Sequence, residues 1–287
     1  MLNYTAPSTA EEVVRILAGA PGTAKVLSGG TDLLVQLRSG RAKPGLIVDI
    51  KNIPGICGIR ERDGGFVIGA STPSAVIGEC EALKLAWPGV VEAANLIGST
   101  QVQGRASLAG NLCNASPAAD SVPPLIAARA TCVVAGPNGR REVPVESIVT
   151  GPGRTSLGRD EFVVAFHLPK RPPRSADAYL RFIPRTEMDI AVVGAGVSVT
   201  LDPGGVCTDA RVVLGAVAPT ALLVADAAAV LIGRALDAAA LDGIDHAAQR
   251  ACKPIDDKRG TIEYRTKVAG VLARRTATIA YQRAGKR

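Results

Sequence analysis

One polar stretch of small residues stands out in this sequence: Ser107-Leu-Ala-Gly-Asn-Leu-Cys-Asn-Ala-Ser-Pro-Ala-Ala-Asp-Ser-Val-Pro-Pro-Leu125. It is too polar for an ordinary core strand. Ala109 and Gly110 would let a backbone come close to a ligand, because little or no side chain stands in the way. Side chains that can hydrogen-bond ring atoms, hydroxyls or phosphates recur at Asn111, Asn114, Ser116, Asp120 and Ser121. The alternative is a plain surface loop, which is the better interpretation for such a stretch in isolation.

A second stretch has similar chemistry, Lys25-Val-Leu-Ser-Gly-Gly-Thr-Asp-Leu-Leu34. The pattern predicts a short strand over 25–27, a glycine turn over 28–31 and a helix over 32–39. A turn between a strand and a helix start can bind a phosphate, because free backbone N–H groups face it. The turn is neither GxGxxG nor a Walker A loop, so a plain turn remains the alternative.

Together the two stretches resemble the FAD-binding loops of the medium subunit of the xanthine dehydrogenase family of molybdenum hydroxylases. Ser28–Leu34 resembles the first loop, and Gln101–Asp120 resembles the second, whose usual core is Thr-Ile-Gly-Gly-Asn. The resemblance covers nearly the whole chain and includes medium subunits of carbon monoxide dehydrogenase, quinoline oxidoreductase and nicotinate dehydrogenase. It extends to Tyr179-x-Arg181-x-x-x-Arg185-x-x-x-Asp189-Ile-Ala191 and to Glu263-Tyr-Arg-Thr-Lys267.

The resemblance implies FAD as the cofactor and assigns roles to individual positions. The first loop would hold the pyrophosphate through backbone N–H groups, and the second loop would close the opposite side. Asn114 and Asp120 would bind hydroxyl or ring atoms, and Arg181 would lie near the flavin. The full expected set is Lys25, Leu27, Ser28, Gly29, Gly30, Thr31, Asp32, Leu33, Ser107, Leu108, Ala109, Gly110, Asn114, Asp120, Val163, Arg181, Asp189 and Ile190. For Arg181, Arg185 and Asp189, a surface salt-bridge network is an equally good interpretation.

The sequence departs from the family pattern at a few positions. Ala109 replaces the first glycine of the Gly-Gly pair, which adds a methyl group where the backbone must approach the cofactor. Gln103, Gly104 and Arg105 replace a more usual Arg-Asn-hydrophobic run. We expect binding to survive these changes.

Composition favours a cofactor-binding protein over a nucleic-acid-binding one. The formal net charge is +7, but the basic residues are scattered and are not interleaved with aromatic residues, which make up only 3% of the chain. An anionic cofactor or an acidic partner surface is enough to explain the excess charge. No span of apolar residues is long enough for a membrane helix, and residues 1–7 do not resemble a signal peptide, so we expect a cytoplasmic protein.

The potential metal ligands form no recognisable motif. The six cysteines include no CxxC pair and no spacing typical of zinc or an iron–sulfur cluster. His167 and His246 are better interpreted as structural or surface residues than as catalytic ones. We therefore expect neither a metal site nor catalytic side chains, and any chemistry would belong to the cofactor.

The order of the elements predicts an α+β fold. The spacing of Ser8 and Glu11 predicts a capping box that begins a helix. Hairpins are predicted over 56–60 with 66–70 and over 131–135 with 140–145, with a further strand over 161–168. Beyond the charged, proline-broken stretch 170–174, the pattern predicts strands over 191–201 and 206–217 and helices over 220–232, 236–252 and 262–283. Strands followed by helices, without strict alternation, favour α+β over a Rossmann sheet.

The resemblance also implies a domain organisation. Residues 1–173 would form a two-lobed FAD-binding domain of the vanillyl-alcohol-oxidase or PCMH-like type, with lobes over about 1–53 and 54–173. Residues 174–287 would form a C-terminal flavoprotein domain, with a small antiparallel sheet and a helical bundle.

The resulting functional hypothesis is an electron-transfer subunit. A small subunit with iron–sulfur clusters would pass electrons to FAD, which would reduce NAD+, a quinone or another acceptor. A large molybdopterin subunit would hydroxylate the organic substrate, and the resemblance implies that the three subunits assemble as a dimer of heterotrimers. Two alternatives stay open: a nucleotide-binding scaffold that has lost the flavin, and a self-contained flavin oxidase.

Overall fold

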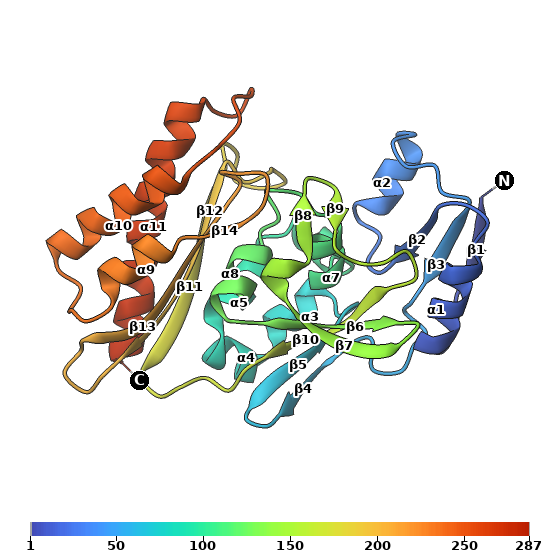
Figure 1. Ribbon diagram of the computed structural model, residues 1–287, viewed down its shortest axis with the longest axis horizontal. Coiled ribbons are helices and arrows are strands. Elements are labelled where there is room, and N and C mark those ends of the chain that lie inside the picture. Colours follow the sequence, from blue (N-terminus) through green and yellow to red (C-terminus); the bar gives the residue numbers. More distant parts are fainter. Residues whose placement is uncertain (1, 287) are drawn as a thin grey trace.

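Sheets of three, five and four strands succeed one another along the long axis of the molecule (Figure 1). The computed structural model describes residues 2–286, so Met1 and Arg287, at the ends of the two expected domains, lie outside the described residues. The fold is α+β, as predicted. No helix within the described range combines the length and the apolar composition that crossing a membrane requires.

The N-terminal sheet is small and parallel. Its strands β1 (Asn3–Thr5), β3 (Leu46–Asp49) and β2 (Ala24–Leu27) lie in that order, with helices α1 (Ala10–Gly19) and α2 (Leu33–Arg38) between them in sequence. The predicted strand and helix on either side of the first glycine turn are therefore confirmed.

The capping box of α1 is one residue later than predicted. Thr9 accepts a hydrogen bond from the backbone N–H of Glu12, and the Glu12 carboxylate accepts one from the N–H of Ser8. The sequence offers Ser8 with Glu11 or Thr9 with Glu12. The second register is adopted because it buries Ala10, Val13 and Leu17 on one face of the helix.

The central sheet is antiparallel, in the order β4 (Ile59–Arg62), β5 (Gly65–Gly69), β10 (Phe162–Leu168), β6 (Thr131–Gly136) and β7 (Gly139–Pro144). The second predicted hairpin and the strand over 161–168 are confirmed. The first hairpin is wrong at its start, since its outer strand begins at Ile59. Gly58 has a φ of +103°, which interrupts an extended strand.

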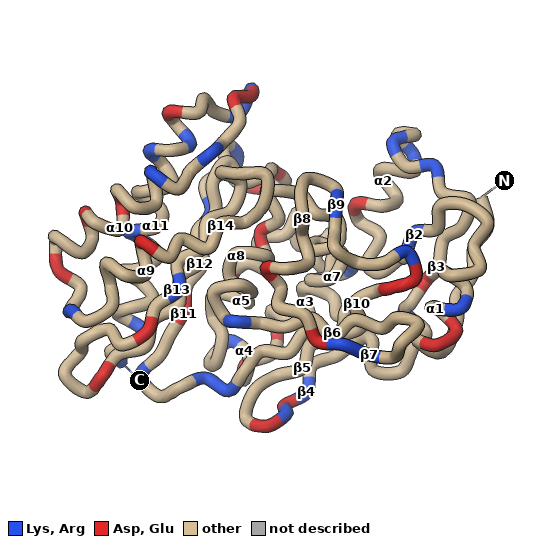
Figure 2. Tube along the Cα trace, in the orientation of Figure 1, with Lys and Arg blue, Asp and Glu red and all other residues tan. Residues whose placement is uncertain are grey.

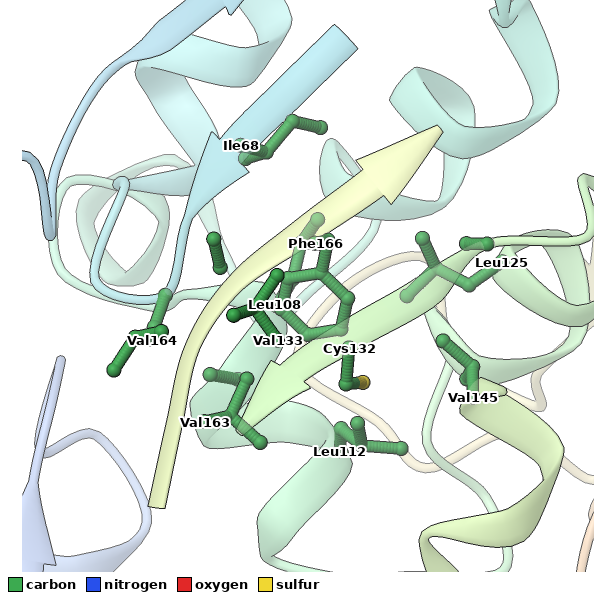
Figure 3. Packing of buried hydrophobic residues seen from close by; sticks show 14 of the residues in the cluster. Ile68, Leu108, Leu112, Leu125, Cys132, Val133, Val145, Val163, Val164 and Phe166 are labelled. Carbon is green, nitrogen blue, oxygen red and sulfur yellow. The ribbon is translucent and has the colours of Figure 1, made fainter. Parts of the chain in front are cut away.

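Short helices cover this sheet and contribute side chains to its hydrophobic core. They are α3 (Ser74–Glu79), α4 (Glu81–Ala86), α5 (Pro88–Ala94), α6 (Thr100–Gln103), α7 (Leu108–Cys113) and α8 (Val122–Ala127), followed by the 3-10 turn η1 (Val145–Ser147) and the hairpin β8 (Val149–Gly151) and β9 (Arg154–Thr155). Leu108 and Leu112 of α7 and Leu125 of α8 pack around Phe166 of β10, which is fully buried (Figure 3). The polar stretch 107–125 is thus two short helices rather than a loop.

The C-terminal sheet is antiparallel, in the order β11 (Ser175–Phe182), β12 (Val193–Leu201), β13 (Cys207–Gly215) and β14 (Leu222–Leu223). Helices α9 (Ala225–Leu231), α10 (Ala238–Ala251) and α11 (Ile262–Gly285) lie on one side of it (Figure 1). Small residues on α11, among them Ala269, Ala273 and Ala277, are fully buried and let the helix approach the sheet closely.

Two details of this part differ from the sequence expectation. β11 was not predicted, because its start, Ser175-Ala-Asp-Ala, has no β-branched or aromatic residue; it is a strand because it pairs along its whole length with β12. The helix predicted over 220–232 begins only at Ala225, since Leu222 and Leu223 pair with β13.

Candidate functional site

A cavity of about 280 Å³ lies where the two glycine-containing stretches meet. The first stretch connects β2 to α2, and the second contains the start of α7. Most of the residues expected to bind the cofactor line this cavity: Lys25, Ser28, Gly29, Gly30, Thr31, Asp32, Leu33, Ser107, Ala109, Gly110, Asn114 and Val163. The structure therefore brings together, in one cavity, two segments that are separated by about 75 residues of sequence.

A buried group of serine hydroxyls joins the two stretches. The Ser28 hydroxyl lies 2.8 Å from the Ser107 hydroxyl and 2.8 Å from the Ser71 hydroxyl, and it can donate to the Ala70 carbonyl at 3.4 Å. Ser107 also caps α7 by accepting a hydrogen bond from the N–H of Gly110. This network fixes the position of the first turn relative to the N-terminus of α7.

Glycine is needed at both positions of the first turn, but for different structural reasons. A Cβ atom on Gly29 would lie 1.8 Å from the carbonyl oxygen of Arg105, so Gly29 is needed for the two stretches to touch. Gly30 has a φ of +82°, a backbone conformation that favours glycine, and a Cβ there would lie 2.9 Å from the Leu27 side chain. The turn is therefore built for close backbone approach on both sides.

Ala109, which departs from the family pattern, is accommodated by the core. The residue is 5% exposed and belongs to the hydrophobic cluster around the central sheet. Although Ala109 also lines the cavity, its side chain takes part in the packing of α7.

Gln36 and Asn111 line the cavity but are outside the expected cofactor-binding set, although Asn111 is among the polar candidates of the second stretch. Gln36 of α2 donates a hydrogen bond of 2.9 Å to the side-chain oxygen of Asn114, and this pair spans the cavity between the two stretches. Asn111 also lines the cavity, and its side-chain oxygen accepts hydrogen bonds from the N–H and the hydroxyl of Ser121. The helical spacing of 32–39 places Gln36 one turn after Asp32, which is the only signal that could have identified it.

The segment between β9 and β10 forms another wall of the cavity, through Thr155, Leu157, Gly158, Arg159 and Glu161. Two contacts hold it in place. Arg159 donates a hydrogen bond to the carbonyl oxygen of Ala20, and Glu161 accepts two from Arg141, at 2.9 and 2.8 Å. The hydrogen bonds from Arg141 lower the pKa of the Glu161 carboxyl, which favours its ionised form.

Burial raises the pKa of two ionisable side chains in the cavity wall. Burial raises the pKa of the Asp32 carboxyl, whose side chain does not cap α2. Part of Cys113 is exposed, but burial of its thiol raises the pKa to about 12. The thiol therefore stays protonated at neutral pH and is a poor nucleophile.

Six of the expected residues lie outside the cavity wall, and they fall into different environments. Leu27 lies beneath Gly30, and Leu108 is 1% exposed in the core. The other four are Asp120, Arg181, Asp189 and Ile190.

Asp120 and Arg181 form a buried ion pair between the central helices and β11. One Asp120 oxygen accepts a hydrogen bond of 2.8 Å from the Tyr179 hydroxyl, and the other accepts one of 2.7 Å from Arg181. The two side chains of the ion pair are 9% and 5% exposed. Burial raises the pKa of the Asp120 carboxyl, although the charge of Arg181 opposes this.

Asp189 and Ile190 lie in the connection between β11 and β12. Asp189 pairs with Arg185 and with Arg259, each at 3.2 Å, and the hydrogen bond from Arg185 is the main reason that the pKa of Asp189 falls to about 2. The salt-bridge interpretation of Arg185 and Asp189 thus describes the observed contacts, while the Ile190 residue is 49% exposed.

Two family models match the chain, one after the other. Residues 1–171 match the family described as the FAD binding domain in molybdopterin dehydrogenase, and residues 178–280 match the CO dehydrogenase flavoprotein C-terminal domain. The carbon monoxide dehydrogenase medium chain of Hydrogenophaga pseudoflava is 33% identical, over 98% of this chain and 97% of its own length. The xanthine dehydrogenase FAD-binding subunit of Escherichia coli O157:H7 is 30% identical, over 99% of this chain and 97% of its own length.

Solved structures give the same assignment. The chain is similar to one in carbon monoxide dehydrogenase from Hydrogenophaga pseudoflava, with a TM-score of 0.94, 34% identity and 98% of each chain covered. It is also similar to a chain of quinoline 2-oxidoreductase from Pseudomonas putida 86, with a TM-score of 0.91, 25% identity and coverage of 99% and 98%. Since the matches span nearly the whole chain in both sequence and structure, the chain belongs to the family of FAD-binding medium subunits of multi-subunit molybdenum hydroxylases.

Proposed function

We propose that the cavity between the two glycine-containing stretches binds one FAD without a covalent bond. The observation that carries the proposal is the shared wall: both stretches line one cavity, and the Ser28–Ser107 contact holds them together. The backbone of Ser28–Asp32 would hold the pyrophosphate from one side, and Ser107–Gly110 would close the other. Gly29 and Gly30 fit this role, since Gly29 lets the two stretches touch and Gly30 gives the turn its φ of +82°.

The remaining wall residues would orient the cofactor. The amides of Gln36 and Asn114 offer both donors and acceptors to its hydroxyl groups, and Lys25 brings a positive charge to the same wall. Val163 and Phe162 would supply apolar contacts. We assign Asp120 a positioning role, because its two oxygens already hold Tyr179 and Arg181. Asp189 and Ile190 remain proposed flavin neighbours in the loop after β11.

The domain organisation is part of the proposal. Residues 1–173 would form the FAD-binding domain, with lobes over about 1–53 and 54–173, and residues 174–287 the C-terminal domain. Two clusters of buried side chains support this division, one around the central sheet and one between the last sheet and α9–α11.

In the complete enzyme this chain would be the electron-transfer subunit. FAD supplies the ability to accept electrons one at a time and to pass them on in pairs. A small iron–sulfur subunit would deliver the electrons, and a large molybdopterin subunit would carry out the hydroxylation. The acceptor would be NAD+, a quinone or another oxidant. The carbon monoxide dehydrogenase relative is itself named a medium chain, which supports the presence of two further subunits.

Native purification tests the proposed assembly. The chain is isolated under its own promoter, and the preparation is assayed for FAD, iron and molybdenum. We expect all three, with two further subunits in the same complex. A homogeneous single chain that contains flavin but neither metal would contradict the assembly, and a single chain that hydroxylates an organic substrate would support the flavin oxidase instead.

A further inference from the structure

A second cavity, of about 320 Å³, lies on the central sheet and shares no residue with the first. We call it the sheet groove. Its floor is apolar and includes Ile53, Ile56, Val133, Val164 and Ala165, and four arginines surround it: Arg60, Arg62, Arg140 and Arg141. Glu142 and His167 also line it, so the groove combines an apolar floor with a strongly charged edge.

The groove and the proposed FAD cavity lie on opposite sides of β10. Val163 lines the FAD cavity, whereas Val164 and Ala165 line the groove. Figure 3 shows Val163 and Val164 pointing to opposite sides of the strand. The pairing of β10 with β6 shifts register between Val163 and Ala165, and this irregularity lies next to both cavities. A ligand in the groove would therefore not occupy the FAD cavity.

Two of the four arginines of the groove are paired with carboxylates of the protein. Arg62 pairs with Asp63 at 3.3 Å, and Arg141 makes two hydrogen bonds to Glu161. Glu142 lies 3.0 Å from Nδ1 of His167. Among the described residues, the other two arginines of the groove make no contact of this kind.

Arg60 and Arg140 are the two remaining arginines of the groove. Within residues 2–286, no hydrogen bond or ion pair engages either side chain. Guanidinium groups bind carboxylates and phosphates with paired hydrogen bonds, so both are available to an anion. Both residues are exposed, so in the described part of the chain the groove has two solvated arginines without a protein partner beside its apolar floor.

The two arginines lie on opposite edges of the sheet. Arg60 belongs to β4 and Arg140 to β7, the first and last strands of the order β4-β5-β10-β6-β7, and basic residues mark both strands in Figure 2. Neighbouring strands lie about 4.8 Å apart, so the two edges are separated by roughly 19 Å. The Arg60 guanidinium lies near the turn at Gly55, 3.9 Å from where a Cβ atom on Gly55 would lie. The two arginines that line the groove thus belong to the two edge strands of the sheet.

We propose that the sheet groove binds an elongated organic dianion. Its two acidic groups, carboxylate or phosphate, would pair with Arg60 and Arg140, and its apolar middle would lie on Val133, Val164 and Ala165. The site is separate from the proposed FAD cavity and does not depend on it.

Isothermal titration of the purified chain, supplemented with FAD, tests the proposal. The probes are suberate, which has a carboxylate at each end of an apolar chain, octanoate, which has one, and inorganic phosphate, which has no apolar part. We expect one suberate per chain, bound at least about tenfold more tightly than octanoate or phosphate, since one end loses a charge-assisted hydrogen bond in each comparison.

Two double variants give a charge-matched comparison. Arg60→Gln/Arg140→Gln should weaken suberate binding by at least about tenfold. Arg38→Gln/Arg41→Gln removes the same charge near α2, outside the groove. This variant should change the affinity for suberate less than about twofold. Circular dichroism checks that both variants fold. Equal affinity for suberate and octanoate, or equal effects of the two double variants, would overturn the proposal. Tighter binding of an acidic peptide than of suberate would assign the groove to a protein partner and would also overturn it.

Discussion

The Ser28 hydroxyl lies 2.8 Å from the Ser107 hydroxyl, at the point where the two glycine-containing stretches meet. Ser28 is 9% exposed and Ser107 is 2% exposed, so the contact is sheltered from water. A buried hydroxyl that loses its partner keeps the cost of its desolvation. The pair therefore links the stability of the fold to the shape of the proposed FAD cavity.

Replacing Ser28 should affect both stability and cofactor binding. We expect Ser28→Ala to lower the free energy of unfolding by about 1–3 kcal/mol, because Ser71 and Ser107 lose a buried partner, and to weaken FAD binding. Urea denaturation and flavin titration measure the two effects. Ser39→Ala is the control, because Ser39 is exposed and its hydroxyl donates to the nearby Gln36 carbonyl; equal destabilisation by both variants would contradict this account.

Gly30→Val should abolish FAD binding while the protein remains folded. Valine cannot adopt the φ of +82° without strain, and its Cβ would displace the Leu27 side chain. Gly22→Val is the matched control, since a Cβ on Gly22 would meet no atom within 4 Å and its φ is not in the left-handed region. Flavin content and far-UV circular dichroism are the measurements. Normal flavin content in Gly30→Val would remove the first turn from the site.

The buried and exposed Arg–Asp pairs of this chain should differ sharply in their contribution to stability. Asp120→Ala leaves Arg181, whose side chain is 5% exposed, without its carboxylate, and should cost about 3–5 kcal/mol of unfolding free energy. Asp209→Ala breaks the exposed pair with Arg129 and should cost less than about 1 kcal/mol. Denaturant unfolding measures both. Similar values for the two variants would mean that the Asp120 pair is solvated.

The carboxyl of Asp189 should titrate with a pKa of about 2, mainly because of Arg185. A lowered carboxyl pKa stabilises the folded state above the usual value of 3.8, and that contribution is lost as the pH falls through about 2. Carbon-13 NMR of the carboxyl should show a larger rise in pKa for Arg185→Ala than for Arg259→Ala. The opposite order would assign the shift to Arg259.

The flavin should be released intact by denaturation. Cys113 is the cysteine in the cavity wall, and with a thiol pKa of about 12 it carries almost no thiolate at neutral pH. Acid or heat treatment should leave the flavin in the supernatant, and iodoacetamide at pH 8 should modify Cys113 slowly. Flavin retained on the precipitate would show a covalent link.

The sequence predicted the parts of the site that depend on local geometry. The strand, glycine turn and helix around Gly30 are encoded by neighbouring residues, and the structure contains them. By contrast, Gly29 is required by the distant Arg105 carbonyl, and Gln36 faces Asn114 only after the chain has folded. Contacts of this kind cannot be read from the spacing of residues along the chain.

The same distinction applies to the fold. The predicted hairpin over 131–145 forms from adjacent strands across a glycine turn, and it was predicted correctly. The sequence does not predict β11, because contacts with distant parts of the chain make its first half a strand. Ala176 and Ala178 are buried in the last sheet, and Asp177 forms an ion pair with Arg171. Its sequence alone carries little preference for a strand.

Flavin stoichiometry is the most direct test of the central claim that this cavity binds FAD. The purified chain is denatured, and the released flavin is identified and quantified against protein by chromatography. We expect one FAD per chain, either as isolated or after incubation with added FAD. A colourless, folded protein that takes up no FAD would contradict the claim and would leave the scaffold as the better interpretation.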